Sequence, residues 1–188
     1  MGANDDIEFI VIGGSAGSLP ILFQLFKNQI KRRVPIAIII HRQRSGNSEL
    51  VKIFKSATDL NAFIEPEDKE AINTSCIYIA PQNYHLLIEK DHTFSLDYSE
   101  AVRYSRPSID VTFESAAKVY GSKVAGIILS GANSDGTAGL EKIVKAGGVG
   151  IAQAPETATY GAMPRSAIDK VEGIKVMTPN EILEFLNG

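Results

Sequence analysis

The serine at position 15 is the first residue of this chain whose surroundings indicate chemistry. Ser15 stands at the centre of the sequence Gly13-Gly14-Ser15-Ala16-Gly17. The apolar run Ile7–Ile12 precedes it, and an apolar helix is expected from about Leu19. A tight G-x-S-x-G turn between a strand and a helix lifts a serine hydroxyl clear of the sheet edge, beside backbone N–H groups that have no helical partners. Serine nucleophiles are commonly presented in this way, although a serine in such a turn is on its own more often a helix N-cap.

A histidine and an aspartate stand at equivalent positions. His41 directly follows the apolar run Val34–Ile40, and Asp135 lies in the loop after the apolar run Val124–Leu129. If the runs are parallel strands, their carboxyl ends share one edge of the sheet, where neighbouring strands lie ~4.8 Å apart. His41 could then accept a serine proton while Asp135 orients it. His41 alone could be a polar strand end and Asp135 alone a helix cap, but the coincidence of all three residues favours a catalytic triad.

The elements that must position these residues follow one repeated order, in which an apolar run precedes a Gly-rich or polar turn and then an amphipathic helix. This alternation is typical of right-handed βαβ crossovers and of a parallel sheet with helices on both faces. We therefore expect an α/β fold with a doubly wound, mostly parallel sheet and flanking helices. The expected helices begin near Leu19, lie near Ser48–Thr58 and span Thr137–Ala146, and a further strand spans Val149–Gln153.

The stretch Ala62–Tyr98 departs from this order and is expected to insert an antiparallel hairpin. Its short β-like runs are Ser75–Ala80, His85–Glu89 and Thr93–Tyr98. The polar triplet Lys90-Asp91-His92 separates the last two runs and is typical of a turn.

Two further helices are expected. One begins at Pro107, because proline is tolerated in the first turn of a helix. Its apolar face would consist of Ile109, Phe113, Ala116, Ala117 and Tyr120. The other is a short amphipathic helix over Pro179–Leu186 near the C-terminal end.

Length and composition fit one globular domain over residues 1–188. The chain has 188 residues, of which 44% are apolar and 22% charged, enough for a sizeable core. Its formal net charge of −3 gives no electrostatic reason to expect binding to nucleic acid or to an anionic membrane. No apolar run approaches the ~20 residues that span a bilayer, and Met1–Glu8 has no signal-peptide core. We therefore expect a cytoplasmic protein without membrane insertion.

Several other chemistries are disfavoured by residue type or spacing. The single cysteine, Cys76, excludes an internal disulfide and a cysteine-based zinc site, and its apolar neighbours favour a buried thiol. The first turn lacks Gly-x-Gly-x-x-Gly, and the chain contains no Gly-Lys-Ser/Thr, so neither phosphate-binding motif is present. The basic residues Lys27, Lys31, Arg32 and Arg33 are interpreted as a solvated helix end.

Six motifs occur in order along nearly the whole chain, from Ile10 to about Ile168. They are Ile12-Gly13-Gly14-Ser15-Ala16-Gly17, Ile38-Ile39-Ile40-His41, Tyr78-Ile79-Ala80-Pro81 with His85, Arg106-Pro107-Ser108-Ile109-Asp110, Leu129-Ser130-Gly131 through Asp135-Gly136, and Met163-Pro164-Arg165-Ser166-Ala167-Ile168. Together they resemble the catalytic domain of the chemotaxis protein-glutamate methylesterases, the CheB family. The order serine, histidine, aspartate differs from that of the α/β-hydrolases, in which the acidic residue precedes the histidine.

The resemblance implies roles for the candidate residues. Ser15 would attack the carbonyl of a glutamate γ-methyl ester, His41 would transfer the proton, and Asp135 would hold the useful histidine tautomer. Glutamines at the same sites could also be deamidated, and no metal or organic cofactor would be needed. The residues expected to donate to the oxyanion or to contact the substrate are Ala16, Gly17, Ala132, Asn133, Arg106, His85 and Met163.

Some of these expectations have alternatives, and the chain departs from the family at two places. Arg106 could dock an acidic receptor helix or form a surface ion pair, Met163 could line the cleft or merely turn the chain, and His85 lies in an expected hairpin strand. Ser18 stands where the family usually has glycine, which could tighten the turn into the helix. Ala132-Asn133 replaces a loop pair that normally ends in glycine, which bears on the oxyanion donors.

The partner implied by the resemblance is a methylated chemoreceptor or a receptor-like coiled coil. Family members often carry an N-terminal phosphoreceiver domain, but here the first strand is expected from Ile7, which leaves no room for one. Regulation by a receiver protein in trans, an unregulated form and a fragment of a larger protein stay open. Two other functions also stay open: a general serine esterase or amidase on small substrates, and a catalytically silent receptor-binding module.

Overall fold

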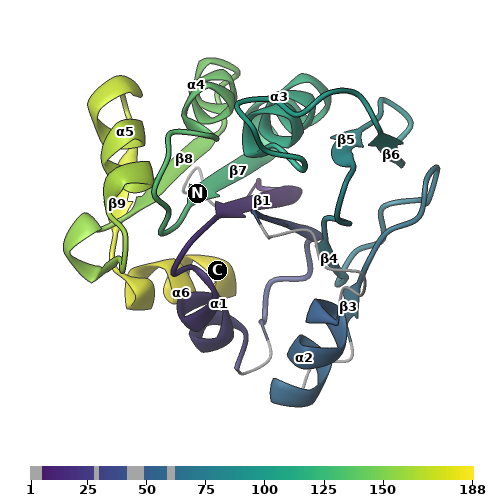
Figure 1. Ribbon diagram of the computed structural model, residues 1–188, viewed down its shortest axis with the longest axis horizontal. Helices are drawn as coiled ribbons and strands as arrows, with labels where there is room; N and C mark the ends of the chain where they lie inside the picture. Colours follow the sequence, from purple (N-terminus) through teal and green to yellow (C-terminus); the bar gives the residue numbers. More distant parts are fainter. Residues whose placement is uncertain (1–5, 28–29, 42–48, 59–61) are drawn as a thin grey trace.

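A seven-stranded sheet runs through the centre of the molecule, and all its strands are parallel (Figure 1). The computed structural model describes residues 6–27, 30–41, 49–58 and 62–188, and within them the strand order is β3-β4-β2-β1-β7-β8-β9. The strands are β1 (Phe9–Gly14), β2 (Ile36–Ile40), β3 (Phe63–Ile64), β4 (Ile77–Ile79), β7 (Val124–Ile128), β8 (Val149–Gln153) and β9 (Lys175–Met177).

Helices cover both faces of this sheet, which confirms the predicted doubly wound α/β fold. Figure 1 shows α3, α4 and α5 over one face and α1, α2 and α6 over the other. The helices are α1 (Leu19–Phe26), α2 (Leu50–Ala57), α3 (Ile109–Tyr120), α4 (Thr137–Lys145), α5 (Ala162–Lys170) and α6 (Pro179–Asn187), with short 3-10 helices at Gly121–Lys123 and Pro155–Thr157. No helix in the described ranges is long and apolar enough to cross a membrane.

The central strands are apolar along their whole length because both of their faces are covered. In β1, Ile10 and Ile12 belong to the core layer that includes α1, α2 and α6. Phe9 and Val11 alternate with them and belong to the layer that includes α3, α4 and α5. A strand buried on both faces has a continuous apolar run rather than an alternating pattern, and this is the pattern by which β1, β2 and β7 were predicted.

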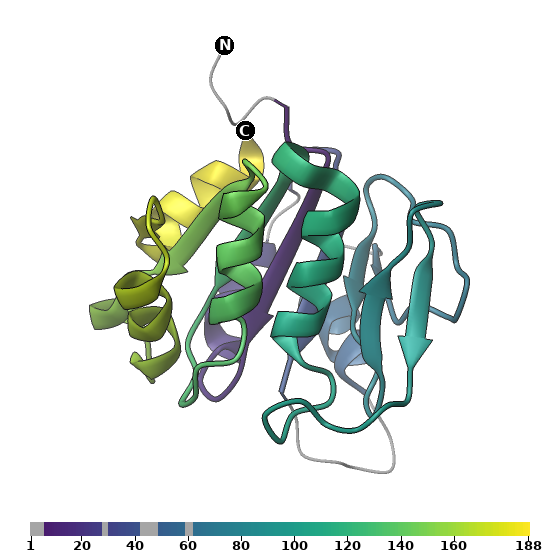
Figure 2. The ribbon, with the colours of Figure 1, turned by 90° about the horizontal axis from the view of Figure 1, so that it is seen from above.

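The predicted antiparallel hairpin is present as a separate sheet of β5 (His85–Ile88) and β6 (Phe94–Asp97). Figure 2 shows it beside α3. Leu86 and Phe94 are buried in the core layer of that helix. The segment that follows β6 returns to the start of α3, next to the candidate site.

Several expected details are wrong. β1 continues through Gly13 and Gly14, so the turn begins only at Ser15. α3 begins at Ile109 with Ser108 as its N-cap, and Pro107 therefore precedes the helix instead of occupying its first turn. The Cys76 thiol was expected to be buried, but the residue is half-buried just before β4.

Three elements were not predicted because their local patterns are weak. β3 and β9 are two and three residues long, too short for a periodic pattern. α5 begins at Ala162, one residue before the motif Met163–Ile168, and carries Pro164 in its first turn. The β-like run Ser75–Ala80 contains β4, which joins the parallel sheet beside β2. The helix expected near Ser48–Thr58 is α2, and Ser48 itself lies outside the described residues.

Candidate active site

Ser15 and His41 follow neighbouring strands at the carboxyl edge of the sheet. Gly14 of β1 is paired with Ile40 of β2, and each candidate is the next residue of its chain segment. The His41 N–H donates to Gly14 O at 3.1 Å, which extends the strand pairing to the histidine itself. The strands that precede Ser15 and His41 are therefore neighbours in the sheet, as predicted.

The turn that presents Ser15 is held through its backbone. Ser15 N–H donates to Ser130 O at 2.9 Å, and the N–H and hydroxyl of Ser18 donate to Ser15 O at 3.1 and 2.7 Å. The N-cap of α1 is Ser18, so the N-cap alternative for Ser15 is wrong. Gly17 has a φ of +76°, and a Cβ there would lie 2.5 Å from Thr159 Cβ, so glycine is required at this position. The Ser15 hydroxyl has no hydrogen-bond partner among the described residues.

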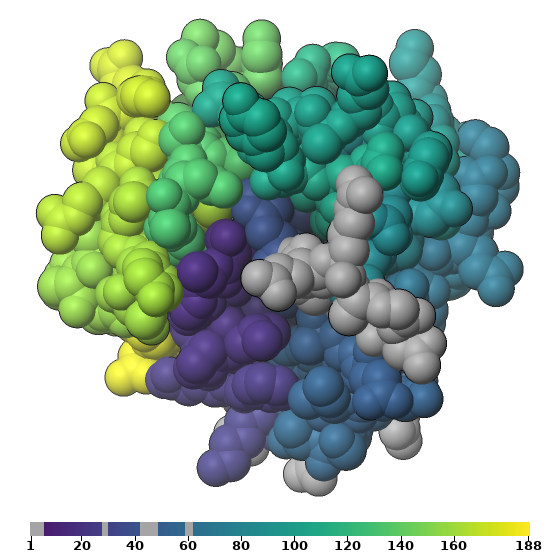
Figure 3. Space-filling view, in the orientation of Figure 1, coloured from purple at the N-terminus to yellow at the C-terminus, as the bar shows by residue number. Residues whose placement is uncertain are grey.

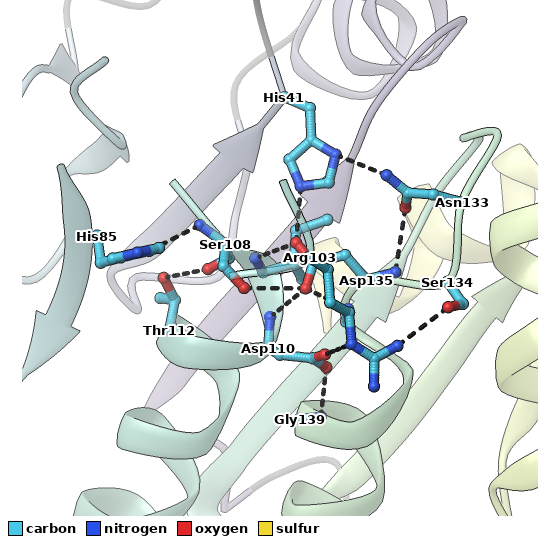
Figure 4. A network of polar contacts seen from close by, with 12 residues as sticks. His41, His85, Arg103, Ser108, Asp110, Thr112, Asn133, Ser134, Asp135 and Gly139 are labelled. Atoms are coloured by element: carbon cyan, nitrogen blue, oxygen red, sulfur yellow. Dashed lines mark hydrogen bonds and ion pairs between the residues drawn. The ribbon is translucent and has the colours of Figure 1, made fainter. Parts of the chain in front are cut away.

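The hydrogen bonds of His41 define which ring nitrogen can act as a base. Nε2 lies 2.7 Å from Asp135 Oδ2, and Nδ1 lies 3.3 Å from the side-chain nitrogen of Asn133 (Figure 4). A carboxylate can only accept, so Nε2 carries the hydrogen, and the Asn133 amide nitrogen can only donate, so Nδ1 carries the lone pair. His41 is therefore held in the tautomer in which Nδ1 can accept a proton.

The Asp135 carboxylate is buried at the start of α3 and is surrounded by donors. Besides His41, it accepts hydrogen bonds from the Ser108 hydroxyl at 2.9 Å and from the N–H groups of Ile109, Asp110 and Gly136 at 2.7, 3.0 and 3.0 Å. The first two N–H groups of a helix have no intrahelical acceptors, and a carboxylate satisfies them favourably. Burial alone would raise the pKa of Asp135, but the bonds from His41, Asp110 and Ile109 outweigh burial and hold its pKa below the ordinary value. Asp135 is thus an ionised partner that stabilises a protonated His41.

A second carboxylate, Asp110, lies beside Asp135 and differs from it. Burial raises the pKa of Asp110, and the nearby Asp135 charge adds to the effect. A hydrogen bond from Gly139 N–H at 2.7 Å and the Arg103 guanidinium, with Nε 3.6 Å from Oδ2, offset this rise only in part. Arg103 Nη1 also donates to Ser134 Oγ at 3.0 Å, so Arg103 joins the start of α3 to the loop that carries Asp135 (Figure 4).

The expected oxyanion donors are in part available. No described residue accepts a hydrogen bond from the N–H of Ala16, Gly17 or Ala132. Ala16 O accepts from Ser130 Oγ at 2.8 Å, which fixes the orientation of the turn beside Ser15. Gly131, in contrast, donates its N–H to Tyr160 O at 3.0 Å and is not available as a donor.

Three further candidates lie behind or beside the triad. His85 is buried, with Nδ1 accepting from Ser108 N–H at 3.1 Å and Nε2 facing Glu100 O at 3.0 Å, so it supports the N-cap that binds Asp135 instead of lining the site. Met163 is buried at the start of α5, and its N–H donates to Gly131 O at 2.9 Å.

Met163 packs against Gly131, where a Cβ would lie 2.5 Å from its Cε and 3.0 Å from Ser15 Cβ. Arg106 forms no ion pair with the described residues, so the alternative of a surface ion pair is wrong. Its Nη1 donates to Tyr98 O and Ser99 O at 3.1 and 2.6 Å, and its guanidinium lies 4.1 Å from the centre of the Tyr98 ring.

Sequence reasoning missed the roles of Ser108, Arg103 and Ser18. Ser108 and Asp110 belong to the motif Arg106–Asp110, but nothing in their spacing indicates that this helix start binds Asp135. Ser18 was noticed as a departure, and its hydroxyl bonds to the backbone of Ser15. Over the described ranges, no group of three or more His, Cys, Asp or Glu side chains is placed to hold a metal ion.

The chain is similar to proteins with a known fold or name. A family model described as CheB methylesterase matches residues 10–186. A Leptospira interrogans protein provisionally named protein-glutamate methylesterase/protein-glutamine glutaminase is 43% identical over 179 residues, which cover 95% of this chain and 92% of that protein. A Thermotoga maritima protein-glutamate methylesterase/protein-glutamine glutaminase is 33% identical over 183 residues, which cover 95% of this chain and 53% of that protein.

A solved structure has the same fold. The crystal structure of the Thermotoga maritima CheB methylesterase catalytic domain superposes with a TM-score of 0.89 at 31% sequence identity, covering 96% of this chain and 97% of that one. The resemblance drawn from the six motifs is confirmed by these matches, and so is the predicted fold class.

Proposed function

Because the chain belongs to the CheB methylesterase family, we propose that it hydrolyses glutamate γ-methyl esters on chemoreceptor-type signalling proteins. The observation that carries this proposal is the arrangement of Ser15 and His41 after paired strands, with His41 bonded to a buried, ionised Asp135. The relatives named above are protein-glutamate methylesterases/protein-glutamine glutaminases, and this enzyme class fits an ester or amide hydrolysed through a serine nucleophile.

The reaction begins with attack of Ser15 Oγ on the ester carbonyl carbon. His41 Nδ1 accepts the hydroxyl proton, and Asp135 stabilises the resulting imidazolium through Nε2–H. Collapse of the tetrahedral intermediate breaks the bond to the methoxy oxygen, and His41 returns the proton so that methanol leaves. Water then attacks the acyl-enzyme with the same histidine as base, which releases the glutamate carboxylate and restores Ser15.

The negative oxygen of each tetrahedral intermediate needs backbone donors. The N–H groups of Ala16, Gly17 and Ala132 are the candidates, because no described residue accepts a hydrogen bond from them and Ala16 and Gly17 directly follow Ser15 in the turn. For a glutamine substrate the steps are the same, except that the leaving group is ammonia.

Asn133 also bears on this mechanism. Its side-chain amide donates to the Nδ1 lone pair at 3.3 Å, which is the lone pair that must accept the Ser15 proton. The Asn133 amide therefore has to leave Nδ1 when the Ser15 hydroxyl approaches. Asn133 Oδ1 meanwhile accepts from Asp135 N–H at 3.0 Å, which keeps the side chain at the loop.

The partners are part of the proposal. The substrate is a methylated receptor helix or a receptor-like coiled coil, and a receiver protein acting in trans is the proposed regulator. Arg106 is proposed to support the substrate-facing segment through its bonds to Tyr98 O and Ser99 O, not through an ion pair.

Methanol release from a methylated chemoreceptor fragment tests the proposal. We expect turnover by the wild type and a fall of about 10³-fold or more in Ser15→Ala and in His41→Ala. Full activity in Ser15→Ala would overturn the assignment of the nucleophile. Hydrolysis of small acyl esters without any release from the receptor fragment would favour a general esterase, and receptor binding without hydrolysis of either would favour a silent binding module.

A further inference from the structure

A tight turn next to the candidate site carries the most exposed large apolar or aromatic side chain of the described residues. Val102 N–H donates to Ser105 O at 3.1 Å, and Ser105 N–H donates to Val102 O at 2.9 Å. The two residues between them, Arg103 and Tyr104, have φ angles of +48° and +64°. Tyr104 has a relative exposure of 103%, so its ring contacts almost nothing in the protein.

This backbone conformation is unfavourable for the residues that adopt it. A two-residue turn with positive φ at both positions normally contains asparagine, aspartate or glycine, because a Cβ destabilises the left-handed region. Arg103 and Tyr104 belong to none of these residue types, and Tyr104 makes no buried contact that would offset the cost of this backbone conformation. Backbone outliers of this kind concentrate at functional sites, where the exposed group has a task other than stabilising the fold.

A hydrogen bond joins this turn to the loop that carries Asp135. Arg103 bonds to Ser134 Oγ at 3.0 Å and approaches Asp110 Oδ2 at 3.6 Å. Ser134 lies in the chain between Asn133, which contacts His41, and Asp135. Tyr104 is the next residue after Arg103, with Cα atoms about 3.8 Å apart, so it lies in the turn that is bonded to the loop carrying Asp135.

Figure 3 looks onto this edge of the sheet and shows a hollow bordered by the purple N-terminal turn, the green loop after β7 and the teal segment before α3. The teal segment also contains Tyr98, which is 65% exposed and stacked beneath the Arg106 guanidinium. Tyrosine and arginine are the residue types enriched where protein partners bind.

We propose that Tyr104 is a docking residue that packs against the helix of a macromolecular substrate while a glutamate ester of that helix enters the site. This inference rests on the proposed function. A helix is about 10–12 Å across and a glutamate side chain is short, so a helix that presents its ester to Ser15 must lie on the rim of the hollow. Side chains one turn before or after the ester then meet the rim, where Tyr104 offers a large ring with few rotatable bonds.

Two substrates with the same ester separate docking from chemistry. One is a helical peptide of about 25–30 residues carrying a single glutamate γ-methyl ester, long enough to form a helix. The other is N-acetyl-glutamate γ-methyl ester amide, which has the same reacting group and no helix. Methanol release is measured for the wild type, Tyr104→Ala, Tyr104→Phe and the control Val176→Ala, which removes exposed apolar surface on β9.

We expect Tyr104→Ala to lower kcat/KM for the peptide by about 5- to 30-fold, mainly through KM, and to change the single-residue ester by less than about twofold. Tyr104→Phe keeps the ring and should stay within about threefold of the wild type. Val176→Ala should match the wild type on both substrates. An equal loss on both substrates in Tyr104→Ala, or no loss on the peptide, would overturn the inference.

Failure of the proposed function gives a different result. If the wild type hydrolyses p-nitrophenyl acetate but neither glutamate ester, the proposed function fails. Docking is then decided by peptide binding, which Tyr104→Ala should weaken about 5- to 30-fold in a Ser15→Ala background and which overturns the inference if unchanged. The unfavourable positive φ of Tyr104 provides an independent test. Tyr104→Gly should raise Tm by about 1–3 °C while weakening the peptide reaction.

Discussion

The two halves of the candidate site are held in different ways. On one side, the Asp135 carboxylate accepts hydrogen bonds from His41, from the Ser108 hydroxyl and from three backbone N–H groups. On the other side, only the backbone of Ser15 is fixed, and its hydroxyl has no described partner. The base is thus oriented during folding, whereas the nucleophile keeps the freedom to meet a substrate.

This difference follows from the chemistry that each half performs. A histidine that becomes charged during the reaction needs a carboxylate that is already in place, because rearranging dipoles at that moment would add to the barrier. The Ser15 hydroxyl has to move so that it gives its proton to His41 Nδ1 while its oxygen attacks the substrate carbonyl carbon. A strong resting hydrogen bond would oppose that movement. Mutations in the two halves should therefore lower the stability of the protein to very different extents.

The largest expected contrast is in stability. Asp135→Ala leaves several buried donors without an acceptor and should lower the free energy of unfolding by about 3–5 kcal/mol. Ser15→Ala removes a hydroxyl without described partners and should change it by less than about 0.5 kcal/mol. Urea unfolding of both variants measures this, and both should be inactive. Equal destabilisation by the two substitutions would remove the distinction between the halves.

Acid should act on Asp135 in a defined direction. Its folded pKa lies below the ordinary value of 3.8, so its ionised form contributes stability that is full above that value. This contribution is lost as the pH falls below 3.8 through the lowered pKa. We expect the stability advantage of the wild type over Asp135→Asn to shrink over that window in denaturant titrations. An advantage that does not change with pH there would mean that Asp135 is not held ionised by its donors.

Asp110 should show the opposite slope in a different window. Burial raises its folded pKa above 3.8, so ionisation of Asp110 costs stability at neutral pH, and this cost disappears as the pH falls to 3.8. The stability of the wild type relative to Asp110→Asn should therefore increase as the solution is acidified toward that value. The same titration measures both carboxylates, and parallel slopes for Asp110 and Asp135 would contradict their assignment to different environments.

The parts of the site that the sequence predicts are those set by topology. Ser15, His41 and Asp135 each follow an apolar run, and parallel strands bring such positions to one edge whatever the details of packing. The role of Ser108 could not be found in this way, because it depends on α3 crossing the sheet so that its start meets the loop after β7. The contact between Asn133 and His41 and the turn at Arg103 and Tyr104 likewise depend on loops whose course no periodic pattern specifies.

The same distinction explains the fold. Long buried strands such as β1 and β2 were predicted from their continuous apolar runs, and their neighbours followed from βαβ handedness. β9 and α5 were missed because β9 pairs over three residues and α5 begins with a proline in its first turn. Both elements are positioned by the neighbouring elements against which they pair or pack, and no pattern in their own sequence predicts them.

The smallest expected effect lies where the two halves meet. Asn133 donates to His41 Nδ1 at 3.3 Å and so holds the lone pair that Ser15 must use. Asn133→Gly removes this competitor. A hydrogen bond of this type contributes about 0.5–1.5 kcal/mol, so the rate of ester hydrolysis should rise by about 2- to 10-fold. A fall in rate, with unchanged stability, would instead mean that the Asn133 amide assists the reaction, and that this half of the site is oriented by Asn133 as much as by Asp135.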